Sequence, residues 1–103
     1  MRPLRPVRAI NFDVKKDTSE IRLLCRSYGQ GPVTFELISS KKVYTEKDLK
    51  TSEKISANLH GIVFYQREKK AVLSHKNALE PGQWTAYFYP HGATIRDVEI
   101  LVD

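Results

Sequence analysis

The feature that most constrains this chain is a period-two alternation of apolar and polar residues, which recurs in short segments separated by turn-forming residues. In residues 10–14 the apolar side chains occupy even positions, and in residues 21–26 and 33–37 they occupy odd positions. Successive side chains of a β-strand point to opposite faces, so this period predicts strands with one buried face. The Gly-Gln-Gly-Pro sequence at residues 29–32 predicts a turn between the second and third strands.

The second half of the chain predicts four further strands. Residues 62–65 are apolar on both faces, which indicates a central strand. The charged residues 66–70 are interpreted as a hairpin loop that leads into a short strand at residues 71–73. Residues 84–89 are rich in aromatic strand formers, and residues 95–102 alternate again. About seven short strands without crossover helices predict a mostly β fold, an antiparallel sandwich, with a small barrel as the alternative.

The middle of the chain, residues 41–60, does not follow this pattern. Thr45 is followed by acidic residues, as at the start of a helix, which allows at most one short helix near residues 46–57. The apolar residues there make no clean helical stripe, and an irregular strand or a long loop fits equally well. We favour a loop that contains at most two helical turns.

The composition is that of one small globular domain spanning residues 1–103, with 41% apolar and 28% charged residues. Cys25 is the only cysteine, so no intrachain disulfide can form, which favours a reducing compartment. No apolar run is long enough to span a bilayer or to form a secretory signal. We therefore expect a cytoplasmic or nuclear protein with no membrane span, unless a signal peptide has been removed.

No set of residues in the sequence matches a catalytic, metal-binding or cofactor-binding pattern. His60, His75 and His91 have no second ligand type at metal-binding spacing. Ser74 is adjacent to His75, but a nucleophile and its base must meet in space with an orienting acid. Cys25 lies on the apolar face of its predicted strand, which favours a buried, inert thiol. We expect no enzymatic activity, no cofactor and no metal.

The net charge of +5 favours an acidic partner, because a basic surface attracts phosphate backbones, anionic lipids and acidic proteins alike. Arg2, Arg5 and Arg8 are interleaved with Pro3 and Pro6 in the first eight residues. Proline suppresses helix and favours extended chain. This segment is therefore either a flexible basic arm that could lie along a phosphate backbone or an acidic groove, or a disordered terminus with ordinary charges.

The aromatic strand at residues 84–89 divides its side chains between two faces. Trp84, Ala86 and Phe88 form the more apolar face and are predicted to be core. Tyr87 and Tyr89 then lie on the other face, partly exposed. Exposed tyrosines can anchor a protein partner or stack on bases, and they also occur as ordinary cross-strand packing.

The segment from Leu79 to Tyr89 resembles the approach to strand F of an immunoglobulin-like or fibronectin type III domain. Glu80 occupies the place of an acid, Trp84 the place of an aromatic residue two positions after the glycine, and Ala86 the place of the core cysteine. Under this resemblance Cys25 falls on strand B, and Phe35 replaces the usual tryptophan of strand C. The resemblance implies a sandwich that presents loops or an edge strand to a partner, without catalysis and without the family disulfide.

Two hypotheses of function follow from the sequence. The first is a non-enzymatic module that binds a protein partner, or a second copy of itself, through loops, an edge strand or the exposed aromatic face. The second is a small basic protein that binds single-stranded nucleic acid or RNA. The candidate binding residues are Arg2, Arg5, Arg8, Arg67, Lys69, Lys70, Tyr87 and Tyr89.

Overall fold

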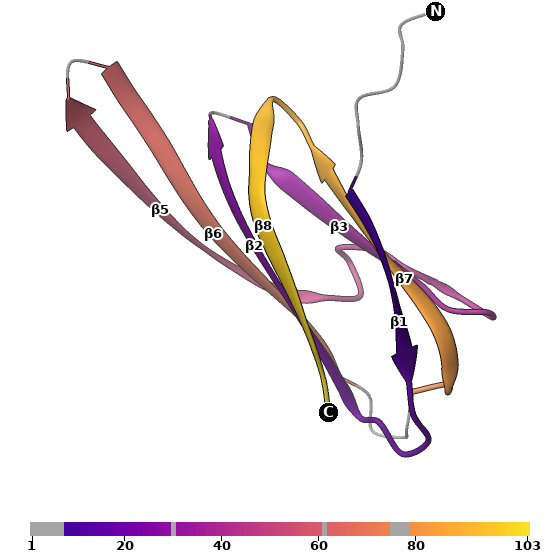
Figure 1. The fold of residues 1–103 in the computed structure, drawn as a ribbon. Helices are drawn as coiled ribbons and strands as arrows, with labels where there is room; N and C mark the ends of the chain where they lie inside the picture. The colour runs from indigo at the N-terminus through magenta and orange to yellow at the C-terminus, as the bar shows by residue number, and fades with distance from the viewer. Residues whose placement is uncertain (1–7, 30, 61, 75–78) are drawn as a thin grey trace, which may run out of the picture.

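The fold, seen in a computed structural model, is a two-layered β-sandwich (Figure 1). The structure describes residues 8–29, 31–60, 62–74 and 79–103, and the side chains of residues 57–60 and 62–64 lie outside that description. The described strands, in chain order, are β1 (Arg8–Val14), β2 (Glu20–Gly29), β3 (Val33–Ile38), β4 (Val43–Tyr44), β5 (Lys50–His60), β6 (Ile62–Ser74), β7 (Gly82–Pro90) and β8 (Ala93–Val102).

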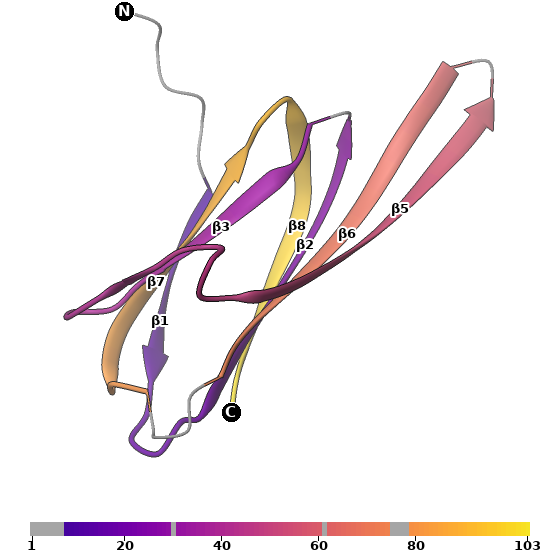
Figure 2. The same cartoon turned by 180° about the vertical axis from the view of Figure 1, so that it is seen from behind.

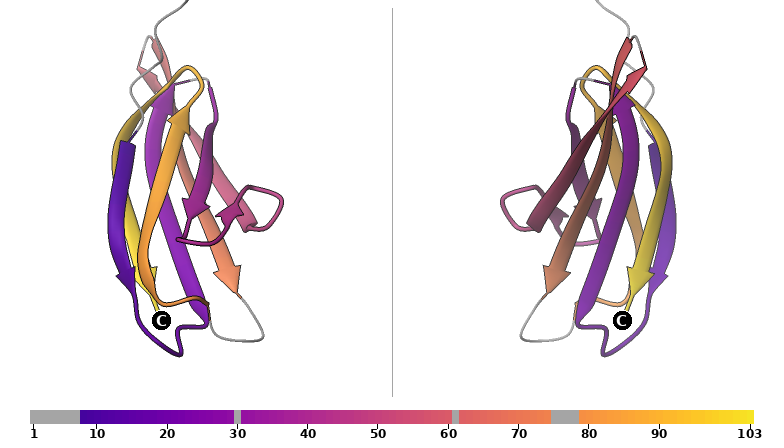
Figure 3. Two further views of the ribbon diagram at one scale, coloured as in Figure 1. Left: turned by 90° about the vertical axis from the view of Figure 1, so that its right-hand side faces the viewer. Right: turned by 90° about the vertical axis from the view of Figure 1, so that its left-hand side faces the viewer.

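Each sheet has four strands, and all of the strand pairs are antiparallel. The first sheet has the order β1-β7-β3-β4, and the second has the order β5-β6-β2-β8. Figure 3 shows that β1 and β8 lie on one side of the sandwich and β4 and β5 on the other. The predicted sandwich is therefore confirmed, and the small barrel considered as its alternative is not formed.

The core lies between the sheets and is filled by alternate residues of their strands, as the period of two requires. Trp84 of β7 is 1% exposed, and its ring stacks on Tyr44 with centroids 5.3 Å apart. The indole N–H of Trp84 donates to the backbone oxygen of Glu80 at 2.9 Å, so this large ring is buried without an unpaired donor. Phe35 and Phe88 meet edge to face at 5.3 Å beside it.

The predicted strands at residues 10–14, 21–26, 33–37, 84–89 and 95–102 are confirmed, and their predicted inward residues are buried or are partly buried against the core. The last strand contains an irregularity that the alternation does not show. Ser27 pairs with Ile95 but Arg26 pairs with Asp97, so Arg96 is the extra residue of a β-bulge.

A close approach of two turns explains the glycine between β2 and β3. Gly31 lies against the turn between β7 and β8, and a Cβ atom there would come within 1.5 Å of the His91 oxygen. The N–H of His91 also donates to the Pro32 oxygen at 2.9 Å. Residue 30 of the predicted turn lies outside the described residues, and only glycine fits at position 31 without moving backbone.

The loop favoured for residues 41–60 is wrong, because this segment forms β4, a short turn and β5. No described residue is helical. The long strand escaped detection because residues 50–56 of β5 are exposed on both faces, so burial imposes no alternation on them. No helix among the described residues is long and apolar enough to cross a membrane.

The charged hairpin loop predicted at residues 66–70 is also wrong. These residues form the middle of β6, where each pairs with β5 on one side and with β2 on the other. The β5–β6 hairpin continues beyond this region, since residues 62–65 of β6 pair with β5 alone (Figures 1 and 2). The side chains that suggested a central strand at residues 62–64 lie outside the described ones.

Lys69 of β6 points into the sandwich and links its two sheets. Its ammonium donates to the Val33 oxygen at 2.8 Å and to the Glu46 carboxylate at 2.7 Å, and it lies 4.9 Å from the centroid of the Phe35 ring. The second oxygen of Glu46 accepts from the Phe35 N–H at 2.8 Å. Only 12% of the Lys69 side chain is exposed, so its charge is matched inside the fold.

Replacing this lysine should destabilise the sandwich. We expect Lys69→Met to lower the free energy of unfolding by about 1–3 kcal/mol, because the Val33 oxygen loses the ammonium donor and the Glu46 carboxylate keeps only the Phe35 N–H. Lys54→Met, at an exposed lysine of β5, is the matched control and should stay within about 0.5 kcal/mol. Urea unfolding of the variants measures both values, and equal effects would contradict this role.

The thiol of Cys25 is 1% exposed in the core, and burial raises its pKa to about 11. Only the thiolate reacts with disulfide reagents, so the native protein should react slowly near pH 8. We expect labelling of Cys25 at pH 8 to accelerate at least about a hundredfold when urea unfolds the chain. Rapid stoichiometric labelling of the native protein would show that this strand is not core.

Candidate binding surfaces

The outer face of the first sheet carries the two tyrosines that the sequence singled out. Tyr87 and Tyr89 lie on β7 with ring centroids 6.1 Å apart and planes 27° from parallel. Both rings are partly exposed, while Trp84, Ala86 and Phe88 of the same strand are buried as predicted. We call this surface the tyrosine face, and its outward-facing residues are Ala9, Asn11, Asp13, Thr34, Glu36, Ile38, Val43, Gln83, Thr85, Tyr87 and Tyr89.

Hydrogen bonds hold the side chains of the tyrosine face in place. The Tyr89 hydroxyl donates to the Glu36 carboxylate at 3.0 Å. Partial burial, followed by this hydrogen bond, raises the pKa of Tyr89, because both favour the neutral phenol. Thr85 donates to the Asn11 side-chain oxygen at 2.7 Å, and so the face is ordered before any partner arrives.

The tyrosine face is acidic, although the chain as a whole carries a net charge of +5. Its charged residues are Asp13 and Glu36, and no outward-facing residue of the described β1, β3, β4 and β7 strands is lysine or arginine. A surface of this kind repels phosphate and attracts basic groups.

The structure does not bring the basic candidates of β6 to the tyrosines. Lys69 points into the interior, where it is bonded to Glu46. Lys70 lies on the outer face of the second sheet, across the core from Tyr87 and Tyr89. Arg67 is 3.4 Å from the Glu53 carboxylate and 3.5 Å from the Gly29 oxygen.

The basic arm predicted at the N-terminus has only one described residue. Arg8 is the first residue of β1 and is exposed there, whereas Arg2 and Arg5 lie outside the described residues. Arg8 is thus part of a sheet rather than of a free arm, and the arm itself stays a prediction.

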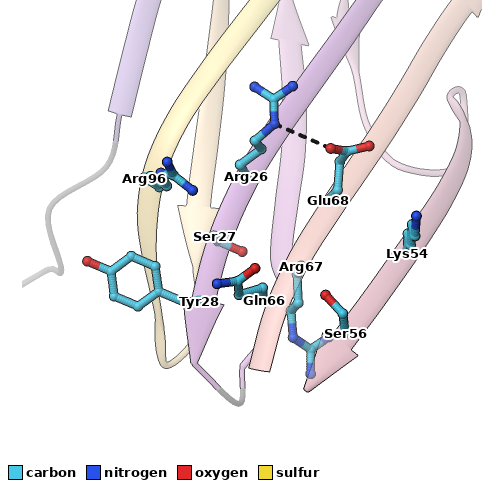
Figure 4. Close-up of a pocket in the computed structure, with 9 residues that line it drawn as sticks. All are labelled: Arg26, Ser27, Tyr28, Lys54, Ser56, Gln66, Arg67, Glu68 and Arg96. Carbon is cyan, nitrogen blue, oxygen red and sulfur yellow. Dashed lines mark hydrogen bonds and ion pairs between the residues drawn. The ribbon is translucent and has the colours of Figure 1, made fainter. Parts of the chain in front are cut away.

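A small hollow of about 170 Å³ on the second sheet brings Arg67, a candidate from the sequence, together with residues that the sequence analysis did not single out (Figure 4). Arg26 lies 3.3 Å from Glu68 and 3.1 Å from Asp97, so much of its charge is already matched. Tyr28 is 43% exposed and lies on the outward-facing side of β2. The alternation of β2 in the sequence could have identified it as an exposed tyrosine. The residues lining the hollow are Arg26, Ser27, Tyr28, Lys54, Ser56, Gln66, Arg67, Glu68 and Arg96.

A dense polar cluster at the end of the core closes a turn. Ser39 donates to Glu80 at 2.5 Å and accepts from the N–H groups of Lys41 and Lys42. The Tyr44 hydroxyl lies 3.3 Å from both Glu80 oxygens, and the hydrogen bond from Ser39 is the main reason that the pKa of Glu80 is lowered. These contacts saturate the serine and its acid, so their arrangement fastens the β3–β4 turn to the start of β7.

The histidines do not join this cluster. His91 is exposed and shares a hydrogen bond of 2.9 Å with the Thr34 hydroxyl, while His75 and the side chain of His60 lie outside the described residues. Within the described part of the chain, no three His, Cys, Asp or Glu residues are grouped so that they could hold a metal ion.

Comparison with known proteins does not place the chain in a family. No family model matches it, and searches of curated proteins and of solved structures give no match. The function must therefore be inferred from the surfaces themselves.

Proposed function

We propose that this chain is a non-enzymatic protein-binding module that holds its partner on the tyrosine face. The observation that carries the proposal is the stacked Tyr87–Tyr89 pair on an outer sheet face whose charges are all acidic. Tyrosine is enriched where proteins bind one another, because its ring buries much area and has few torsions to restrict.

The chemistry of the face indicates what its partner presents. Glu36 and Asp13 favour an arginine or a lysine, and the faces of the tyrosine rings accept the same cations. Ile38 and Val43, the latter 49% exposed, add an apolar side to the surface next to Thr85. The partner surface that fits therefore presents basic side chains to Glu36 and the tyrosine rings, and apolar side chains to Ile38 and Val43 at the β4 side.

We also infer that the sandwich is a variant of the immunoglobulin-like type. The order β2-β6-β5 corresponds to strands B, E and D, and the pairing of β3 with β7 corresponds to C and F. Cys25 lies on the strand that the resemblance assigned to B. The departure is that the first and last strands have exchanged sheets, since β1 pairs with β7 and β8 with β2.

Substitution of both tyrosines should abolish partner binding without unfolding the chain. We expect Tyr87→Ser with Tyr89→Ser to weaken binding at least about thirtyfold, the loss typical of anchor residues. Peptides selected from a displayed random library by the wild-type chain serve as the ligands, and fluorescence anisotropy measures their affinity. Selected peptides should be enriched in arginine and lysine next to apolar residues.

Tyr28→Ser is the matched control, since this tyrosine is more exposed than Tyr87 and Tyr89 but lies on the outer face of the second sheet. It should leave peptide affinity unchanged, and circular dichroism should show intact sheet in every variant. Selection of acidic peptides, or equal losses in the control and the double variant, would refute the tyrosine face as the binding site.

A second candidate function, binding of single-stranded nucleic acid, is favoured by the hollow of Figure 4. Four of its lining residues are basic, one is acidic, and Tyr28 offers a ring for stacking. Against it, Arg26 is held by Glu68, Asp97 and Glu99, the last at 3.6 Å, and Arg67 by Glu53. The charge left for phosphates is small, and we therefore rank this candidate second.

Binding of labelled mixed-sequence oligonucleotides at low salt separates the two candidates. Nucleic-acid binding should weaken steeply as salt rises, and Arg96→Ser with Lys54→Ser should reduce the salt slope by about one to two. We expect no binding even at about 25 mM salt, where screening is weak and any attraction to phosphate is strongest. Tight, salt-sensitive binding that survives Tyr87→Ser and Tyr89→Ser would reverse the ranking.

A further inference from the structure

The outer face of the second sheet has its own pattern, which the tyrosine face does not share. Leu24 of β2 is flanked on the same face by Lys70 of β6 and by Glu99 of β8. This row therefore runs cation, leucine, anion across the three strands. Paired residues of neighbouring strands lie side by side, so the two charges are placed at similar distances on opposite sides of Leu24.

The next row on this face is apolar at both ends. Val72 of β6 and Leu101 of β8 flank Arg22, and Leu101 is 61% exposed. Arg22 itself is held by Glu20, with nitrogen and oxygen 2.6 Å apart. Between the two rows lies a hollow of about 370 Å³, lined in part by Leu24, Val72 and Leu101. An exposed leucine beside an apolar hollow is a feature that binding would bury.

We propose that a second copy of this chain packs on this face, related by a two-fold axis that runs along β2 between the two copies. A half turn about that axis places β6 of one copy over β8 of the other. Lys70 of each copy then meets Glu99 of the other, and Val72 meets Leu101, so each of these contacts occurs twice. Leu24 packs against its own counterpart at the axis, as an isologous interface requires.

The charge order is what selects this occupant and this orientation. A half turn about an axis that crosses the strands at this row would instead place Lys70 of one copy over Lys70 of the other, and Glu99 over Glu99. Like charges would then repel at both ends of the row. The arginines nearest the axis bring their own acids, because Arg22 is paired with Glu20. Arg26 is paired with Glu68 and Asp97, and it also lies 3.6 Å from Glu99, which Lys70 of the other copy would approach from the opposite side. The Leu24 row is thus complementary to itself in this arrangement, while the Arg26 row places Glu68 of one copy over Asp97 of the other, each beside the Arg26 guanidinium that it already contacts.

Three strands spaced about 4.8 Å apart, with a rise of about 3.3 Å per residue, give an overlap of roughly 400–500 Å². That is smaller than the roughly 800 Å² that each partner of a standard interface buries. The dimer should accordingly be weak, with dissociation in about the micromolar range or above. Both tyrosine faces stay free and point outward on opposite sides of the dimer. A ligand with two matching sites would then be bound with avidity, a consequence that rests on the proposed function of the tyrosine face, whereas the dimer itself does not.

Charge reversal tests the arrangement by analytical ultracentrifugation over a range of protein concentrations. Lys70→Glu alone and Glu99→Lys alone should each raise the dissociation constant at least about tenfold, because each brings like charges together twice. An equimolar mixture of the two variants should dimerise again, since one chain now has two acids in this row and the other two bases.

Lys54→Glu is the control, because Lys54 is on β5 and lies outside the overlap of β6, β2 and β8. It should leave the dissociation constant unchanged. A wild-type chain that stays monomeric at millimolar concentration, a dimer that tolerates Lys70→Glu, or a mixture of variants that does not associate would each overturn the proposal. Circular dichroism of every variant ensures that loss of the dimer is not loss of the fold.

Discussion

The structure depends on the burial of alternate side chains between two antiparallel sheets. Once Ile21, Leu23 and Cys25 face the core, the residues between them must face outward, because the period of a strand is fixed at two. The same rule that places Trp84 and Phe88 in the core sets the tyrosines of β7 outside. The packing of the core therefore determines which residues of each sheet face outward. The two outer surfaces differ in chemistry because different residues occupy these outward positions.

At the edges of this core, hydrogen bonds and ion pairs of buried and partly buried polar side chains join the two sheets and their turns. Lys69 reaches across from β6 to the Val33 oxygen and to Glu46, and Glu80 gathers Ser39 and Tyr44 beneath Trp84. Each link joins segments that are far apart in sequence. Such groups are stable inside a protein only when every donor and acceptor is used, and among the described residues no buried side-chain nitrogen or oxygen lacks a partner.

The alternation predicted the strands that have one buried and one solvated face, and with them the division of β7 into Trp84 and Phe88 on one side and the tyrosines on the other. It failed for β5, which is an edge strand with both faces exposed along residues 50–56, and it misplaced residues 66–70 of β6. Charge there suggested a loop, because Glu46, the residue that accepts Lys69, lies 23 positions away and no local pattern reveals it. The row that contains Lys70 and Glu99 could likewise not be predicted from the sequence, because it depends on the register in which β6 and β8 pair with β2.

The most direct test of this account is amide hydrogen exchange at residues 66–70, measured residue by residue by nuclear magnetic resonance. These amides belong to a strand that is paired on both sides, so they should exchange among the slowest in the chain, together with those of β2 and β7. Exchange as fast as in the turn at residues 15–19 would mean that this segment is a charged loop. The inward position of Lys69, the strand order of the second sheet and the assignment of residues to its outer face would then all be wrong.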